Sequence, residues 1–200
     1  DFWDIKQNDL RRQRDGIYFS ETKIIQNQKI LFLGLDTRFF RSQLTKSNNA
    51  YVVNNDPEAT ILGNEQWIWL ENELAKPHDI LILASSIQVL ATEHRFEKWS
   101  NFPHERKRLL SLLGDLSSHV LLLSGDRHRG GIYQYGDIVE ITASSLNRGI
   151  FPSYETDKLL LGETHPQNNY GLIEIEKDKL SIFLKDEHMQ PLESFIIPLK

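Results

Sequence analysis

The segment 124–130 (Ser-Gly-Asp-Arg-His-Arg-Gly) holds the residue types in this sequence that are best suited to chemistry. Asp126 and His128 lie two positions apart, so in an extended loop their side chains can converge on one ion. A carboxylate with an imidazole suits Zn, Fe or Mn, whereas a carboxylate alone also suits Ca or Mg. Arg127 and Arg129 could neutralise phosphate oxygens or pair with carboxylates. The alternative interpretation is a strand-to-strand turn in which Asp126 caps the backbone and His128 is a surface residue.

Two other polar segments, Asp36–Arg38 and Ser85–Gln88, also follow apolar runs directly. Asp36 and Arg38 could form a buried ion pair that fixes a strand end, or Arg38 could bind an anionic substrate. The two serines of the second segment have no Gly-x-Ser-x-Gly elbow around them, which favours a helix cap or a polar strand end over a nucleophile. Gln88 could bind a metal through its amide oxygen or serve as a structural hydrogen-bonding residue.

These polar segments end a repeating pattern of apolar strands and amphipathic helices. The apolar runs 29–36, 79–84 and 119–123 predict buried strands. The stretches 65–75 and 105–113 between them predict helices. This β-α-β-α-β order implies a mostly parallel sheet with right-handed crossovers. Because ligands gather at the carboxyl ends of parallel strands, all three polar segments fall where a site is expected.

Shorter strands are predicted on both sides of this α/β unit. Residues 16–22 alternate aromatic and polar side chains, and the polar residues 26–28 predict a hairpin turn after them. Residues 48–57 and 148–168 read as loops. The remaining predicted strands are 131–135, 138–142, 170–175, 180–184 and 194–197. The fold class is therefore α/β (α+β), with sheets packed together and covered by helices.

The composition indicates one globular domain and excludes several classes of protein. The chain has 200 residues, a net charge of −5 and no Cys, so disulfides, thiolate metal sites and a Cys nucleophile are excluded. The mild acidity argues against a nucleic-acid-binding module, which would usually carry a basic stripe. The longest apolar runs are too short for a transmembrane segment.

The order of the segments resembles the PhoD-like metallophosphoesterases, the alkaline phosphatase D family. The resemblance extends from the first residues to about Glu176, nearly the whole chain, and the collinear set that includes Ser-Gly-Asp-Arg-His is specific. The matching stretches are 11–18 (RRQRDGIY), 35–42 (LDTRFFRS), 59–70 (ATILGNEQWIWL), 85–89 (SSIQV), 96–110 (FEKWSNFPHERKRLL), 123–128 (LSGDRH), 142–147 (TASSLN) and 168–171 (NNYG).

The resemblance implies a calcineurin-like metallophosphoesterase β-sandwich flanked by helices. It also implies hydrolysis of phosphate mono- or diesters by a metal-bound hydroxide at a metal cluster, with iron and calcium expected and Zn, Mn or Mg as alternatives. Asp126 and His128 carry over as the catalytic, metal-binding pair, with Asp126 in place of the first His of the Gly-His-x-His loop of calcineurin-like enzymes. Arg38, Gln88 and Asn169 are expected to line the substrate site.

In the family that the chain resembles, Asp-containing metal motifs precede the part that matches. Residues 1–200, which begin at Asp1 without a Met, are therefore expected to be the C-terminal part of one metallophosphoesterase domain. The N-terminal half would belong to the same protein or to a complementary chain. One Asp-x-His pair cannot supply two closed metal sites, so the isolated chain is expected to be inactive or nearly so, and to expose an apolar sheet edge.

Two rival functions remain open from the sequence. The first is a non-catalytic binding subunit that retains the fold, and the second is a serine hydrolase that uses Ser85 or Ser86. The expected ligand is a phosphate-ester substrate. Many relatives are exported, which favours a secreted or periplasmic location, with a cytoplasmic one as the alternative.

Overall fold

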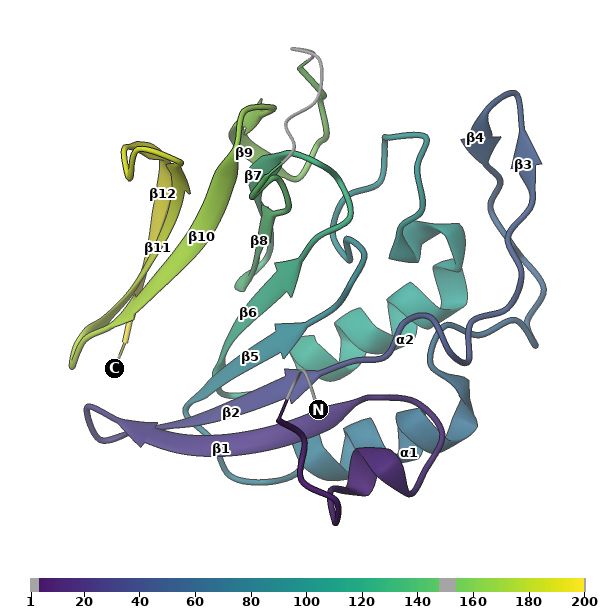
Figure 1. Ribbon diagram of the computed structural model, residues 1–200, viewed down its shortest axis with the longest axis horizontal. Coiled ribbons are helices and arrows are strands. Elements are labelled where there is room, and N and C mark those ends of the chain that lie inside the picture. The colour runs from purple at the N-terminus through teal and green to yellow at the C-terminus, as the bar shows by residue number, and fades with distance from the viewer. Residues whose placement is uncertain (1–3, 148–153, 200) are drawn as a thin grey trace.

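A computed structural model describes residues 4–147 and 154–199. Within these residues, a seven-stranded sheet lies between two helices on one face and a three-stranded sheet on the other (Figure 1). The large sheet has the strand order β1-β2-β5-β6-β8-β7-β9. Its strands are β1 (Phe19–Ile25), β2 (Gln28–Gly34), β5 (Ile80–Ala84), β6 (His119–Ser124), β7 (Gly130–Tyr135), β8 (Ile138–Ala143) and β9 (Leu160–His165).

The centre of the large sheet is parallel, as the sequence predicts. Strands β2, β5, β6 and β8 run in the same direction, and β1, β7 and β9 are antiparallel to their neighbours. Helix α1 (Gly63–Leu74) connects β2 to β5, and α2 (Pro103–Gly114), with Pro103 in its first turn, connects β5 to β6. The short 3-10 helices are η1 (Leu10–Arg12) and η2 (Trp99–Asn101). None of the described helices is long and apolar enough to cross a membrane.

Both faces of the parallel strands are buried, which explains why their sequences are continuous apolar runs rather than alternating ones. Leu31 and Leu81 are paired across β2 and β5 and pack on the helix side. Ile30 and Ile80, one position earlier, pack on the opposite side of the sheet. Two apolar cores, one against the helices and one against the smaller sheet, therefore hold the parallel strands in place.

The smaller sheet consists of β10 (Asn169–Ile175), β11 (Lys179–Asp186) and β12 (Pro191–Pro198) in that order. Leu180, Ile182 and Leu184 of its central strand are buried against the large sheet. The two sheets approach so closely at Gly130 that an added Cβ would overlap the side chain of Leu184. The predicted packing of two sheets covered by helices is thus confirmed.

Three local predictions from the sequence are wrong in their bounds. The strand predicted at 16–22 is β1, which starts at Phe19 after a left-handed Gly16. The loop predicted at 48–57 begins inside a small hairpin, β3 (Lys46–Ser47) and β4 (Ala50–Tyr51). The region predicted as loop from 148 to 168 contains β9, and its residues 148–153 lie outside the described residues.

Strand β1 forms one edge of the large sheet. Ile24, near the end of this strand, is 75% exposed, so this edge strand presents an apolar side chain to solvent.

Candidate active site at the carboxyl ends of the parallel strands

The three polar segments predicted at the strand ends do meet at the carboxyl ends of the parallel strands. The hydroxyls of Thr37, after β2, and Ser86, after β5, are 2.5 Å apart. Arg38 Nη2 donates a hydrogen bond of 2.9 Å to Asp126 Oδ2 in the loop after β6. The sheet thus brings together side chains that are up to 88 positions apart in the sequence.

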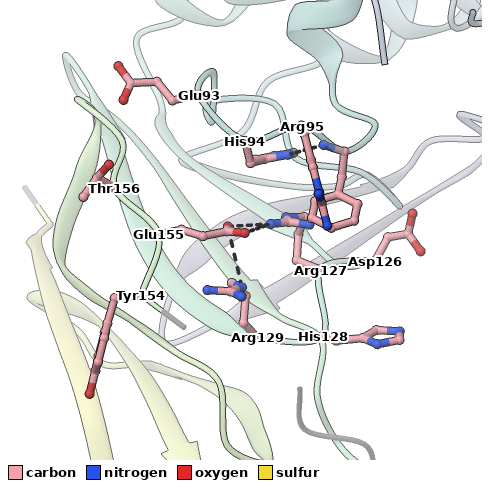
Figure 2. A pocket seen from close by; sticks show the side chains of 11 residues that line it. Glu93, His94, Arg95, Asp126, Arg127, His128, Arg129, Tyr154, Glu155 and Thr156 are labelled. Carbon is pink, nitrogen blue, oxygen red and sulfur yellow. Dashed lines mark hydrogen bonds and ion pairs between the residues drawn. The ribbon is translucent and has the colours of Figure 1, made fainter. Parts of the chain in front are cut away.

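The β6–β7 loop presents its successive side chains in alternate directions. Figure 2 shows Asp126 and His128 on one side of the loop, and Arg127 and Arg129 on the other side, toward Glu155. Asp126 and His128 are exposed, whereas the two arginines are buried. Asp126 and His128 have φ values of +64° and +50°, in the left-handed region. Such conformations cost about 1–2 kcal/mol each in non-Gly residues and concentrate at functional sites.

The two residues predicted as metal ligands fit part of a metal site. Asp126 and His128 offer a carboxylate and an imidazole from one loop, which is a donor pair that transition metals accept. Within residues 4–147 and 154–199, no group of three or more His, Asp or Glu side chains is arranged to hold a metal ion. The role of Asp126 and His128 as metal ligands stays a prediction.

Arg38 links Asp126 to a second carboxylate. Its Nη1 lies 2.5 Å from Glu97 Oε2, and Arg41 Nη1 lies 2.8 Å from the other Glu97 oxygen. Burial lowers the pKa of Arg38, but hydrogen bonding and attraction to Glu97 and then Asp126 outweigh it, so the pKa is raised overall. Arg38 is therefore a fixed positive charge beside Asp126.

The ion pair considered for Asp36 and Arg38 is not formed. The Asp36 carboxylate accepts hydrogen bonds from the backbone N–H groups of Ile17, Arg38 and Phe39 instead. Its own backbone N–H and carbonyl bond to the side chain of Gln66 in α1. Asp36 thus shapes the turn after β2, and this leaves the Arg38 side chain free to reach Glu97 and Asp126.

Gln88 and Asn169 are buried and are held by contacts of their own. Gln88 Nε2 donates to Thr142 Oγ1 at 2.8 Å, at the end of β8. Asn169 Nδ2 donates to the Gln167 carbonyl at 2.7 Å. None of the hydrogen bonds of these two side chains reaches Asp126 or His128. Their role in lining the substrate site stays a prediction.

The two serines after β5 have structural partners. Ser85 Oγ donates to the Ile87 carbonyl at 2.7 Å and accepts from Trp99 Nε1 at 3.0 Å. Ser86 Oγ is bonded to Thr37. Within the described part of the chain, none of these hydrogen bonds involves a histidine or a lysine, so neither hydroxyl is bonded there to the adjacent base that a serine nucleophile needs.

A pocket of about 780 Å³ opens beside the β6–β7 loop. It is lined by residues 126–129 of that loop and by two segments that the sequence did not link to it, Glu93–Phe96 and Tyr154–Thr156. Arg127 Nη2 contacts both oxygens of Glu155, at 2.5 and 2.6 Å, and Arg129 Nε lies 3.6 Å from the same carboxylate (Figure 2).

His94 in this pocket is kept neutral by its surroundings. Burial, followed by the positive charges of Arg127, Lys98 and Arg129, lowers the pKa of His94 to about 2. Its Nδ1 accepts a hydrogen bond of 3.2 Å from the Phe96 backbone N–H. The proton of the neutral ring therefore lies on Nε2. No spacing motif marked His94 in the sequence.

Comparisons with solved structures find the same fold in three other proteins, two of which are titled phosphatases. The chain is similar to a structure titled GAP50, the anchor in the inner membrane complex of Plasmodium, with a TM-score of 0.67 and 14% identity over 92% of this chain and 55% of that one. It is similar to the purple acid phosphatase PPD1 from yellow lupin seeds, with a TM-score of 0.65 and 12% identity over 90% of this chain and 32% of that one. A dimetal phosphatase from Danio rerio gives a TM-score of 0.54 and 14% identity over 96% of this chain and 63% of that one.

These likenesses show the calcineurin-like fold, and the chain spans between about one third and two thirds of the length of each of these proteins. No curated protein matches the chain. A sequence model of a protein family, described as PhoD-like phosphatase, matches residues 21–185, which include the whole β6–β7 loop. The chain therefore belongs to the PhoD-like phosphatase family.

Proposed function

We propose that this chain supplies one wall of the active site of a metal-dependent phosphoric ester hydrolase. The observation that carries the proposal is the exposed pair Asp126 and His128, side by side in a left-handed loop at the carboxyl edge of the parallel strands. Membership of the PhoD-like family and the metallophosphatase fold support a phosphoesterase.

In this proposal Asp126 and His128 hold metal ions, with iron and calcium as the preferred candidates. The bound ions would supply Lewis-acid charge and water activation for attack at phosphorus. Arg38, held in place by Glu97, would stabilise negative charge on the phosphate oxygens next to Asp126. A metal bound to Asp126 would weaken the ion pair between Asp126 and Arg38, and the Arg38 guanidinium would then be available to the substrate.

The remaining metal ligands would come from an N-terminal half of the same protein or from a complementary chain. The support is that the described residues supply no group of three ligands, and that the chain spans 55% of the length of the Plasmodium protein. Residues 1–200 would then be the C-terminal part of one metallophosphoesterase domain. A secreted or periplasmic location stays a prediction.

The test compares the isolated 200-residue chain with a longer protein that contains it. Bis-p-nitrophenyl phosphate and p-nitrophenyl phosphate are assayed with Ca²⁺ and Fe³⁺, and then after chelation. We expect turnover by the longer protein, loss of turnover with chelator, and little turnover by the isolated chain. Metal-independent turnover would refute the proposal, and a longer protein that binds metal without turnover would favour the non-catalytic binding subunit.

A further inference from the structure

In the pocket beside the β6–β7 loop, two buried arginines share one carboxylate. The side chains of Arg127 and Arg129 are 4% and 3% exposed, and both contact the single carboxylate of Glu155. Lys98 is also buried nearby, and its Nζ donates to the carbonyls of His94 and Phe96. Buried charges are costly unless they are paired, so this arrangement favours the entry of an anion.

The other carboxylates around the pocket are engaged elsewhere. Asp126 pairs with Arg38, and Glu93 lies 3.8 Å from Lys158. Asp157, next to the pocket in sequence, accepts hydrogen bonds from the backbone N–H groups of Thr92 and Glu93, and its negative charge acts on Lys98 rather than on the two arginines. Glu155 therefore remains the one carboxylate that contacts the buried arginines in the described part of the chain.

Two hydrogen-bond donors in the pocket also lack an acceptor. Among the described residues, Arg127 Nε and His94 Nε2 are buried atoms with no hydrogen-bond partner. Because His94 Nδ1 accepts from the Phe96 N–H, the ring presents an N–H at Nε2. A ligand that satisfies both groups must offer acceptor oxygens, as a phosphate or a carboxylate does.

The walls of the pocket suit a group larger than a single ion. Arg127 lies over the ring of Phe96, 4.4 Å from its centroid, and Phe96 is 43% exposed. Tyr154 on the other wall is 72% exposed. With a volume of about 780 Å³, the cavity is in the size range of pockets that hold small organic ligands.

From these contacts we infer that the pocket of His94, Arg127, Arg129 and Glu155 binds a second anionic group, a phosphate or a carboxylate, carried by the substrate. This inference deepens the proposed function, on which it rests. Asp126 and His128 point to one side of the loop and the arginines to the other (Figure 2), and all four residues line the same pocket. The reacting phosphate and the second anion would therefore bind next to each other along this loop. The substrate class is then phosphate esters with an additional anionic group.

The first test measures anion binding to the metal-free 200-residue chain by isothermal titration calorimetry at constant ionic strength. Inorganic phosphate and malonate are titrated separately, with chloride as the control. We expect saturable binding of phosphate, of malonate or of both. Binding should weaken at least tenfold in His94→Phe and Arg127→Gln, and it should be unchanged in Arg108→Gln, whose exposed side chain pairs with Glu71 on the helix side.

Glu155→Gln guards against a result that reflects only misfolding. Removal of this carboxylate should tighten anion binding at least fivefold, which a damaged fold cannot imitate. No saturable binding by the parent chain, or equal binding by His94→Phe, would overturn the inference.

The second test uses the longer protein and compares kcat/KM for esters with and without a second anionic group. We expect kcat/KM of the parent protein to be at least tenfold higher for the esters that carry a second anionic group, and we expect His94→Phe to lose this preference. If metal-dependent turnover is present without any preference, this inference fails while the proposed function stands. If anion binding is present but turnover is absent, the proposed function fails instead.

Discussion

The buried carboxylate of Glu140 on β8 fixes the segment that carries Gln88, and we predict that its removal destabilises the chain. Its two oxygens accept hydrogen bonds from the backbone N–H groups of Val89, at 2.9 Å, and Leu90, at 2.6 Å. Arg106 donates to the carbonyls of the same two residues at 2.7 and 2.9 Å. The segment is therefore held from both sides by opposite charges.

The magnitude follows from the donors that Glu140→Ala would leave unpaired. Each buried N–H that loses its acceptor costs about 1–3 kcal/mol, so the two together cost about 2–6 kcal/mol of unfolding free energy. This is a large part of the stability of an ordinary domain, which is about 5–15 kcal/mol. Urea unfolding followed by circular dichroism measures it. Glu174→Ala, at an exposed position of β10, is the control and should change stability by less than about 0.5 kcal/mol.

The pH dependence gives a second measurement on the same residue. Burial raises the pKa of Glu140 above its ordinary value, so the folded chain holds this proton more tightly than the unfolded chain does. The stability contributed by this site is complete at low pH and falls as the pH rises from the ordinary value through the raised one. Glu140→Gln should remove that fall. A loss below about 1 kcal/mol in Glu140→Ala, or parallel pH profiles, would refute this reasoning.

Three further predictions concern the pocket, the contact between the sheets and the charged edge. Because the pKa of His94 is lowered to about 2 from 6.5, the free energy of unfolding should fall as the pH drops below 6.5, by up to about 1.4 kcal/mol per pH unit. Urea midpoints measured at a series of acidic pH values test this, and His94→Gln should make them depend less on pH. The same pH dependence in His94→Gln as in the parent chain would contradict the prediction. Gly130→Ala should lower the free energy of unfolding by about 1–3 kcal/mol, because the added Cβ overlaps Leu184. In urea unfolding, the double variant with Leu184→Ala should lose less than the sum of the two single losses. Losses that add fully would contradict the overlap. Arg38→Ala should tighten Mn²⁺ binding to the isolated chain by about two- to fivefold, because the half-exposed ion pair between Arg38 and Asp126 is worth up to about 1 kcal/mol. Electron paramagnetic resonance titrations with Mn²⁺ measure this affinity. Weaker binding by Arg38→Ala would show that Arg38 does not compete with the metal for Asp126.

The parallel part of the fold was predictable because its strands are buried on both faces. The apolar runs that became β2, β5 and β6 leave a clear signal, and the polar residues after them mark the sheet edge where Arg38 and Asp126 meet. The strand β9 was missed because it is irregular. Its pairing with β7 shifts register between Gly130 and Ile132 of β7, and its own Gly162 has a φ of +65°. Its sequence therefore does not alternate as a regular strand does.

The pocket was beyond the reach of sequence reasoning because its residues are joined only by tertiary contacts. Arg127 and Glu155 are 28 positions apart, and nothing in the spacing of either predicts that they pair. His94 stands in a loop without a metal-binding or catalytic motif, so its neutral state depends on cations that packing brings near it. Asp36 shows the opposite case, in which adjacency to Arg38 suggested an ion pair and local backbone N–H groups took the carboxylate instead.

The most direct test of the central claim is a paired measurement of metal content and phosphodiesterase turnover in the longer protein, with and without His128→Ala. Mass spectrometry of the bound metals and hydrolysis of bis-p-nitrophenyl phosphate are measured on the same preparations, with His188→Ala, an exposed histidine in the turn between β11 and β12, as the matched control. We predict that His128→Ala loses bound metal and at least 100-fold in kcat/KM, whereas His188→Ala retains both. Unchanged metal content and turnover in His128→Ala would contradict the assignment of the β6–β7 loop as a wall of the metal site.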